Sequence, residues 1–106
     1  MTTGEIPRSL ERLTEISEEI GGVNIDLLDG LKELGGLAKE AAIEGTRVGL
    51  APHQPGRFEE MMVTVYRDAE VRGLDLIMVN KIFTAIHESS IAQQEAATAI
   101  ELSLGQ

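Results

Sequence analysis

Three polar side chains near the C-terminus are spaced so that a single helical face would carry them together. His87, Ser90 and Gln94 follow one another at intervals of three and four residues, with Ile91 beside them, and such residues are neighbours on a helix surface. An imidazole can donate a hydrogen bond to an anion or take part in acid–base chemistry. The alternative is that the histidine is simply packed and that Ser90 and Gln94 form a polar stripe at a dimer seam.

Few other residues in the sequence have the type and spacing of a catalytic, metal-binding or cofactor-binding site. It contains no cysteine, which excludes disulfides, thiolate metal sites and a cysteine nucleophile. The carboxylate pairs Asp26 with Asp29 and Glu59 with Glu60 have no histidine at ligand spacing, so we expect no metal site. No phosphate-binding loop or dinucleotide fingerprint occurs, and we expect no cofactor. His53 is expected to be a solvated loop residue.

Composition and charge narrow the class of protein. A chain of 106 residues fits a single domain, which we place at 1–106. The net charge of −9, from 18 acidic and 9 basic residues, argues against nucleic acid as a partner. No segment from Met1 to Arg8 looks like a secretory leader, and no apolar run is long enough to span a membrane. We therefore expect a soluble, cytoplasmic protein that makes no membrane contact.

The elements that must position these residues are helices. Apolar spacing predicts an all-α chain with helices at about 6–44, 57–71 and 75–104, in which Thr2 or Thr3 could cap the first. The turn formers between Gly45 and Gly56 predict a loop. The five glycines from Gly21 to Gly36 each cost about 1 kcal/mol in a helix. They either split the first helix in two or lie within one long helix held by packing, and we favour the long helix because the apolar spacing keeps its phase.

The expected helix ends and faces follow from local sequence. Gly73 suits the position just after the second helix, and Asp75 suits the N-cap of the third. The apolar faces are predicted to consist of Ile16, Ile20, Val23, Leu27, Leu31, Leu34, Leu37 and Ala41 in the first helix, of Met61, Met62, Val65, Tyr66 and Ala69 in the second, and of Ile77, Val79, Ile82, Phe83, Ile86, Ser90, Gln94 and Ala97 in the third.

Three segments resemble the AroQ-type chorismate mutase family, and its aminodeoxychorismate mutase-like members most. Gln54-Pro55-Gly56-Arg57 resembles the turn that opens the family's second helix. Gly73-Leu74-Asp75 resembles the junction between its last two helices. Residues 81–94 resemble its final helix, where an Ile-Phe or Leu-Phe pair precedes a Ser and then a Gln four residues on. The resemblance implies a three-helix AroQ-type fold in an intertwined homodimer.

The resemblance also implies a reaction on a small-molecule substrate. Chorismate mutases of this type carry out a Claisen rearrangement, a pericyclic step that needs no nucleophile and no base. Holding the substrate in a compact conformer, and placing donors at its ether oxygen, favours the reaction. By the resemblance, Arg57 is the pocket arginine, and Ser90 and Gln94 are the pair that contacts a substrate carboxylate and the ether oxygen. The alternative for Arg57 is a solvated arginine after a turn.

Four positions depart from the family's pattern. The first-helix arginine that reaches the partner's pocket matches Ser17, and the second first-helix arginine matches Leu34. The pocket lysine near the end of that helix matches Gly45, and the glutamate that follows the second-helix arginine matches Phe58. Three of the four expected cations are therefore absent, and the pocket gains apolar surface.

Two other arginines are candidates to replace the missing cations. Arg47 lies two residues beyond Gly45, on the predicted loop, and Arg12 lies about one turn before Ser17. A small shift of register would bring either of them inward. The alternative for each is an ordinary solvated charge.

The sequence thus favours a chorismate mutase-like isomerase that rearranges chorismate or a related shikimate-derived compound. Arg57, Gln94 and His87 would act on the substrate, and Ser90, Ser17, Leu34, Phe58, Arg47 and Ile91 would bind or enclose it. One alternative is a pericyclase or cyclase acting on a larger, more apolar specialised metabolite. Another is a non-catalytic, dimeric helical module that regulates a partner enzyme.

Overall fold

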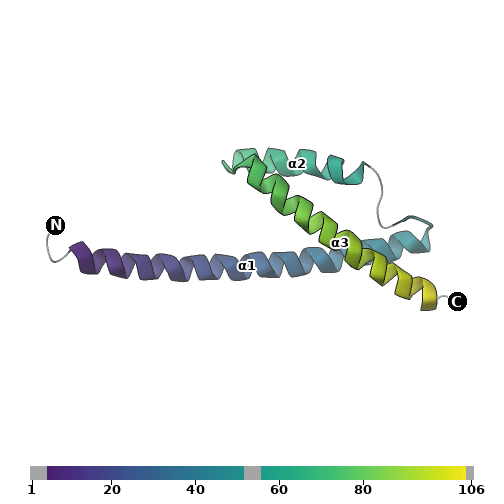
Figure 1. Ribbon diagram of the computed structural model, residues 1–106, viewed down its shortest axis with the longest axis horizontal. Helices are drawn as coiled ribbons and strands as arrows, with labels where there is room; N and C mark the ends of the chain where they lie inside the picture. The colour runs from purple at the N-terminus through teal and green to yellow at the C-terminus, as the bar shows by residue number, and fades with distance from the viewer. Residues whose placement is uncertain (1–4, 52–55, 105–106) are drawn as a thin grey trace. The chain divides into compact units, whose positions relative to one another are not determined.

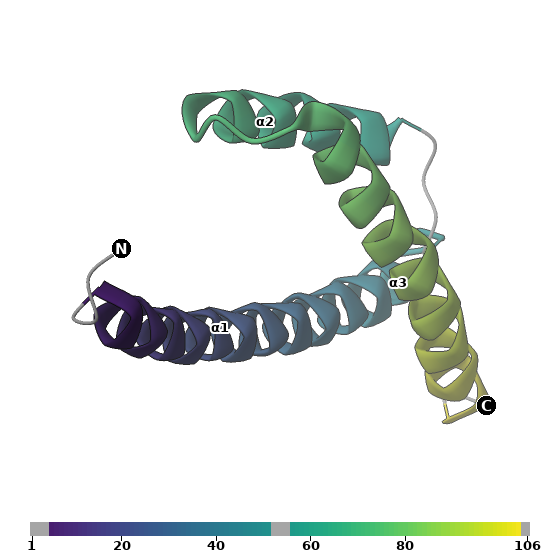
Figure 2. The same ribbon diagram turned by 60° about the vertical axis from the view of Figure 1, so that its left-hand side comes forward.

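The computed structural model describes residues 5–51 and 56–104 (Figures 1 and 2). This part of the chain forms three helices and no strand: α1 spans Glu5–Arg47, α2 spans Arg57–Val71 and α3 spans Leu76–Leu104. The all-α class predicted from apolar composition and spacing is confirmed. Thr2 and Thr3, proposed as helix caps, and His53, Gln54 and Pro55 of the loop lie outside the described residues.

The chain divides into two units, Met1–Leu34 and Gly35–Gln106. The described part of the first unit is helical from Glu5 onward. The second unit contains the last turns of α1 together with α2 and α3. Inside the second unit, α2 and α3 follow each other and pack together (Figures 1 and 2).

α1 is helical through all five of its internal glycines from Gly21 to Gly36. Among the described residues, and leaving aside the adjacent backbone of α1 itself, a Cβ added at any of these five would meet no atom within 4 Å. Most of the predicted apolar stripe of α1 is exposed, and among its first seven members only Ile16 is partly covered. The exposed large side chains of the stripe are Ile20, Val23, Leu27, Leu31, Leu34 and Leu37.

The end of α1 lies later in the chain than the sequence suggested. Gly45 and Arg47, which we expected in the loop, belong to the last turn of the helix. Arg47 Nη1 donates to Glu44 Oε1 at 2.6 Å, and a cation in the last turn also interacts favourably with the helix dipole. The helix ends at Arg47, and the turn that follows contains Gly49, whose φ of 84° is left-handed. The Leu50 N–H donates to the Gly45 carbonyl at 2.8 Å.

The turn between α2 and α3 uses the glycine that the sequence singled out. Gly73 has a φ of 67°, a conformation that costs a glycine little because it has no Cβ. The Gly73 N–H donates to the Glu70 carbonyl and the Leu74 N–H to the Ala69 carbonyl, each at 3.0 Å. This pair of bonds is a Schellman motif, which satisfies the last carbonyls of α2. The predicted position of Gly73 after the helix is confirmed.

The start of α3 is fixed by its predicted cap. Asp75 Oδ1 accepts a hydrogen bond from the Ile77 N–H at 3.0 Å, which satisfies one of the four donors left without a partner at a helix start. Asp75 therefore ends the turn and begins the helix, as its position before an apolar run predicted. α2 has no such side-chain cap: it follows Gly56, whose φ is 88°.

The described core lies mainly where α2 packs on α3, and Ala42 of α1 is buried as well. Its buried residues are small or flexible, which lets the helices approach closely. Two predicted inward positions of α3 are wrong, because Ile77 and Ile82 are 69% and 47% exposed. Met61, on the apolar face of α2, is 42% exposed. The buried residues among those described are Ala42, Met62, Ala69, Val79 and Thr98.

Candidate functional site

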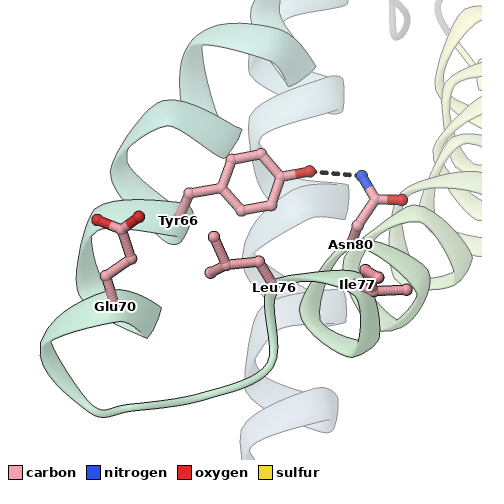
Figure 3. A pocket seen from close by; sticks show the side chains of 5 residues that line it. All are labelled: Tyr66, Glu70, Leu76, Ile77 and Asn80. Carbon is pink, nitrogen blue, oxygen red and sulfur yellow. Dashed lines mark hydrogen bonds between the residues drawn. The ribbon is translucent and has the colours of Figure 1, made fainter.

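Two contacts between side chains hold α2 against α3 at successive levels above the Gly73 turn. Near the turn, Asn80 Nδ2 donates to Tyr66 Oη at 2.5 Å (Figure 3). Farther from it, the rings of Phe58 and His87 stack with centroids 4.2 Å apart and an interplanar angle of 20°. In a helical hairpin, residues at similar distances before and after the turn come together, and both pairs obey that rule.

The stacked pair brings the head of α2 to the middle of α3. Phe58 is the second residue of α2 and directly follows Arg57. His87 belongs to the α3 face that we singled out, and both rings are half-buried. Residues predicted to bind substrate from two separate segments are therefore joined by one contact. Sequence reasoning named Phe58 and His87 individually, and the structure pairs them.

The remaining polar residues of that α3 face share one environment. His87, Ser90, Ile91 and Gln94 are all half-buried, whereas Glu88 and Gln93 between them are exposed. No side-chain hydrogen bond joins Ser90 or Gln94 to another described residue, and Gln93 instead donates to Ser89 at 3.2 Å. Ser90 and Gln94 therefore keep their hydrogen-bonding groups available on the face that carries His87.

The three arginines considered as substrate anchors differ in how they are engaged. Arg12 Nη1 lies 3.1 Å from Glu15 and 3.5 Å from Glu19, and Arg47 lies 2.6 Å from Glu44. Both pairings are on α1 and exposed, so each adds only a few tenths of a kcal/mol to the helix. The Arg57 guanidinium is exposed and makes no hydrogen bond or ion pair with the described residues. Among these three, Arg57 is the cation best placed to meet an added anion.

The residues at the other altered positions are divided between the units. Ser17 and Leu34 belong to the first unit, where both are exposed, Leu34 by 41%. Gly45 belongs to the second unit and is half-buried in the last turn of α1. A Cβ added to Gly45 would lie 3.5 Å from Leu50 Cβ, an ordinary contact.

Three of the hollows on the second unit are lined entirely by residues that the structure describes. One of about 340 Å³ lies beside the stacked pair and is lined by His87, Glu88, Ile91 and Glu95. A second, of about 450 Å³, surrounds the hydrogen bond between Tyr66 and Asn80 (Figure 3). The third, of about 200 Å³, is mainly apolar. It is lined by Val65, Asp68, Ala69, Arg72, Leu74, Val79 and Phe83.

Sequence reasoning did not identify the Tyr66–Asn80 hollow. Tyr66 had been placed on an apolar face, and the amide of Asn80 was not considered as its partner. Two features of the sequence could have predicted this contact. Tyr66 and Asn80 lie at similar distances from Gly73, and a partly buried phenol needs a hydrogen-bonding partner. Leu76 and Ile77 supply the apolar side of this hollow, and Glu70 supplies a carboxylate.

Within the described residues, no group of three or more metal-ligating side chains comes together. No helix in that part of the chain is both long and apolar enough to cross a membrane. Comparison of the chain with protein families, with curated proteins and with solved structures finds no match.

Proposed function

We propose that this protein is a helical isomerase of the AroQ chorismate mutase type that rearranges chorismate or a related shikimate-derived compound. The observation that supports the proposal most is the stacking of Phe58 on His87. Phe58 directly follows Arg57 at the head of α2, and His87 belongs to the α3 face that carries Ser90 and Gln94. These are the residues to which the resemblance assigns substrate contacts.

The proposed rearrangement requires the protein mainly to bind the substrate and to orient it. A pericyclic rearrangement proceeds within one molecule, so the protein lowers the barrier by holding a compact conformer and by stabilising charge at the breaking ether bond. The Arg57 guanidinium would bind a substrate carboxylate through its planar pair of donors. The Gln94 amide would donate to the ether oxygen, and the Ser90 hydroxyl would complete the binding of the carboxylate.

The proposed active form is a homodimer, and the exposed side chains of α1 support it. From Leu10 to Leu37 the helix carries exposed large apolar residues at helical spacing, over a length of about 40 Å. Soluble monomers rarely expose apolar patches larger than a few hundred Å². In such a dimer the stripe of each copy would pack against the stripe of the other, so the apolar side chains of both would be buried. Each fully buried side chain would contribute roughly 1.5–3 kcal/mol to the stability of the dimer.

The first test is turnover of chorismate by the purified protein, with Arg57→Ala compared with Arg67→Ala. Arg67 is exposed on the same helix and controls for the loss of one positive charge. We expect kcat/KM to fall by about 100-fold or more for Arg57→Ala and to change little for Arg67→Ala. Equal turnover by the wild type and Arg57→Ala would show that the site is assigned to the wrong residue.

A second candidate function keeps the fold and changes the substrate. A pericyclase or cyclase for a larger, more apolar specialised metabolite is favoured by the half-buried Phe58 where the family pattern has a glutamate. Genes for assembly-line biosynthesis beside this one would favour that candidate, whereas a shikimate operon would oppose it. If the folded dimer turns over neither kind of substrate and co-purifies with a larger biosynthetic enzyme, a regulatory role is the better explanation.

A further inference from the structure

The hollow of about 450 Å³ lies between the end of α2 and the start of α3. Its volume is within the range that small-molecule sites occupy. The proposed substrate site does not use it, because Tyr66 lies eight residues after Phe58, about 12 Å farther along α2. Figure 3 shows the five side chains that line it, which are Tyr66 and Glu70 of α2 and Leu76, Ile77 and Asn80 of α3.

The ring of Tyr66 is held in a defined position in this hollow. Its Oη accepts a hydrogen bond from Asn80 Nδ2 at 2.5 Å, and the ring extends from α2 toward that amide (Figure 3). The Tyr66 side chain is half-buried. The hydrogen bond fixes the polar end of the ring, so the ring offers an ordered aromatic surface to a ligand.

The carboxylate of Glu70 lies in the same hollow and is exposed. It makes no hydrogen bond or ion pair with the described residues. Glu70 follows Tyr66 by four positions in α2, and residues four apart are neighbours on a helix surface, with about 5–6 Å between their Cβ atoms. A cation paired with Glu70 would therefore also lie close to the Tyr66 ring, whose face attracts cations within about 6 Å of its centre.

The α3 side of the hollow is apolar. Leu76 is half-buried, and Ile77 is 69% exposed. Glu70 is the one charged group among the described residues that line the hollow. A ligand with an apolar body would remove part of the Ile77 and Leu76 side chains from water, which is favourable in proportion to the area covered.

The geometry points to a small organic ammonium ion as the ligand of this hollow. Its cationic group would lie between the Glu70 carboxylate and the Tyr66 ring, and its apolar body would lie on Leu76 and Ile77. The net charge of −9 attracts cations of every kind to this protein. The ring and the two apolar side chains would select those that carry an apolar body. The inference does not rest on the proposed function.

Four small probes test the charge and the apolar body separately. Hexylammonium carries both, ethylammonium carries the charge with a short body, 1-hexanol is neutral and hexanoate is an anion. Each is titrated into the full chain to about 10 mM, because probes of this size bind in the millimolar range. Binding is followed by amide chemical shifts in nuclear magnetic resonance spectra. We expect hexylammonium to bind at least five-fold more tightly than the other three and to shift the amides of Glu70, Ile77 and Asn80.

Matched variants separate the carboxylate from the ring. Glu70→Gln should remove the preference for hexylammonium over 1-hexanol, and the control Glu60→Gln, an exposed residue of the same helix, should keep it. Tyr66→Leu should weaken hexylammonium at least two-fold more than 1-hexanol, because it leaves an apolar side chain without an aromatic face. Tyr66→Phe keeps the ring and should keep the preference.

Three results would overturn the inference. One is 1-hexanol or hexanoate binding as tightly as hexylammonium. Another is equal binding of hexylammonium and ethylammonium, with shifts spread over the acidic surface of the chain, or an equal effect of Glu70→Gln and Glu60→Gln. The third is that no probe shifts the amides around the hollow in the folded protein.

The probes also distinguish this inference from the proposed function. A protein that rearranges chorismate but does not bind hexylammonium would keep the proposed function and refute the ammonium site. A protein that binds hexylammonium through Glu70 and Tyr66, but leaves chorismate unchanged, would support the ammonium site and count against the proposed function.

Discussion

The ring of Phe58 stacks on the imidazole of His87 with a centroid separation of 4.2 Å, and this contact joins the first turn of α2 to the middle of α3. It lies about two helical turns away from the Tyr66–Asn80 hydrogen bond, which joins the same two helices near their common turn. The angle between α2 and α3 is therefore set at two levels. Any change in that angle would move Arg57 relative to the face that carries Ser90 and Gln94.

The stacked rings should be energetically coupled. In a double-mutant cycle of Phe58→Leu with His87→Leu, measured by urea unfolding at one protein concentration, we expect a coupling free energy of about 0.5–1.5 kcal/mol. A control cycle pairs Phe58→Leu with Lys81→Ala, an exposed α3 residue, and should be additive within about 0.5 kcal/mol. Equal coupling in the two cycles would mean that the rings do not pack on each other in solution.

Interactions between residues close in the sequence allowed the helix ends to be predicted better than the contacts between helices. Gly73 and Asp75 act through bonds to residues within five positions, so their roles could be read from the sequence. The inward face of α3 was partly misassigned at Ile77 and Ile82, which are exposed. Apolar residues recur on more than one side of this helix, and only packing against α2 decides which side is covered.

In the candidate site, too, the features within one helix could be predicted from the sequence and the contacts between helices could not. The spacing of His87, Ser90 and Gln94 predicted a shared face, because helical periodicity alone fixes it. The stacking of His87 on Phe58 could not be predicted in this way, since it depends on the angle between two helices. The glycines and prolines after Gly45 predict a loop that includes Arg47, whereas α1 continues to Arg47, which pairs with Glu44 in its last turn.

The Gly73 turn offers a test of backbone conformation alone. A Cβ at Gly73 would meet nothing within 4 Å, so Gly73→Ala changes only the conformational energy at a φ of 67°. We expect the free energy of unfolding to fall by about 1 kcal/mol. The control Gly36→Ala, inside α1 and also without close neighbours, should raise it by up to about 1 kcal/mol. If Gly73→Ala is as stabilising as the control, the left-handed turn is not present in solution.

The proposed dimer predicts that two equally exposed residues of α1 respond differently to a charge. Leu27 and Ile25 are 61% and 60% exposed, but two residues turn a helix by about 200°, so they point to opposite sides. Leu27 lies on the stripe formed with Ile20, Val23 and Leu31. We expect Leu27→Lys to raise the dimer dissociation constant by about 100-fold or more and Ile25→Lys to change it little, as measured by sedimentation equilibrium. Equal responses would mean that the stripe is not the dimer surface.

Two glycines of α1 test how closely a second α1 approaches. Gly30 lies on the apolar stripe, about 40° of helical rotation from Leu34 and about 60° from Leu27, whereas Gly36 lies about 100° or more from every member of the stripe. Within the described residues, neither has an atom outside its own stretch of helix within 4 Å of an added Cβ, so within one chain both alanine variants should gain up to about 1 kcal/mol in helix stability.

If the partner's helix packs closely along the stripe, the new methyl at position 30 must displace it, which typically costs about 1–3 kcal/mol. Gly30→Ala should then weaken the dimer, and Gly36→Ala should strengthen the fold without changing dimer affinity. Sedimentation equilibrium distinguishes the two effects, because it measures the dimer dissociation constant itself. A gain in stability from both variants, with unchanged dimer affinity, would show that the partner does not approach α1 at Gly30.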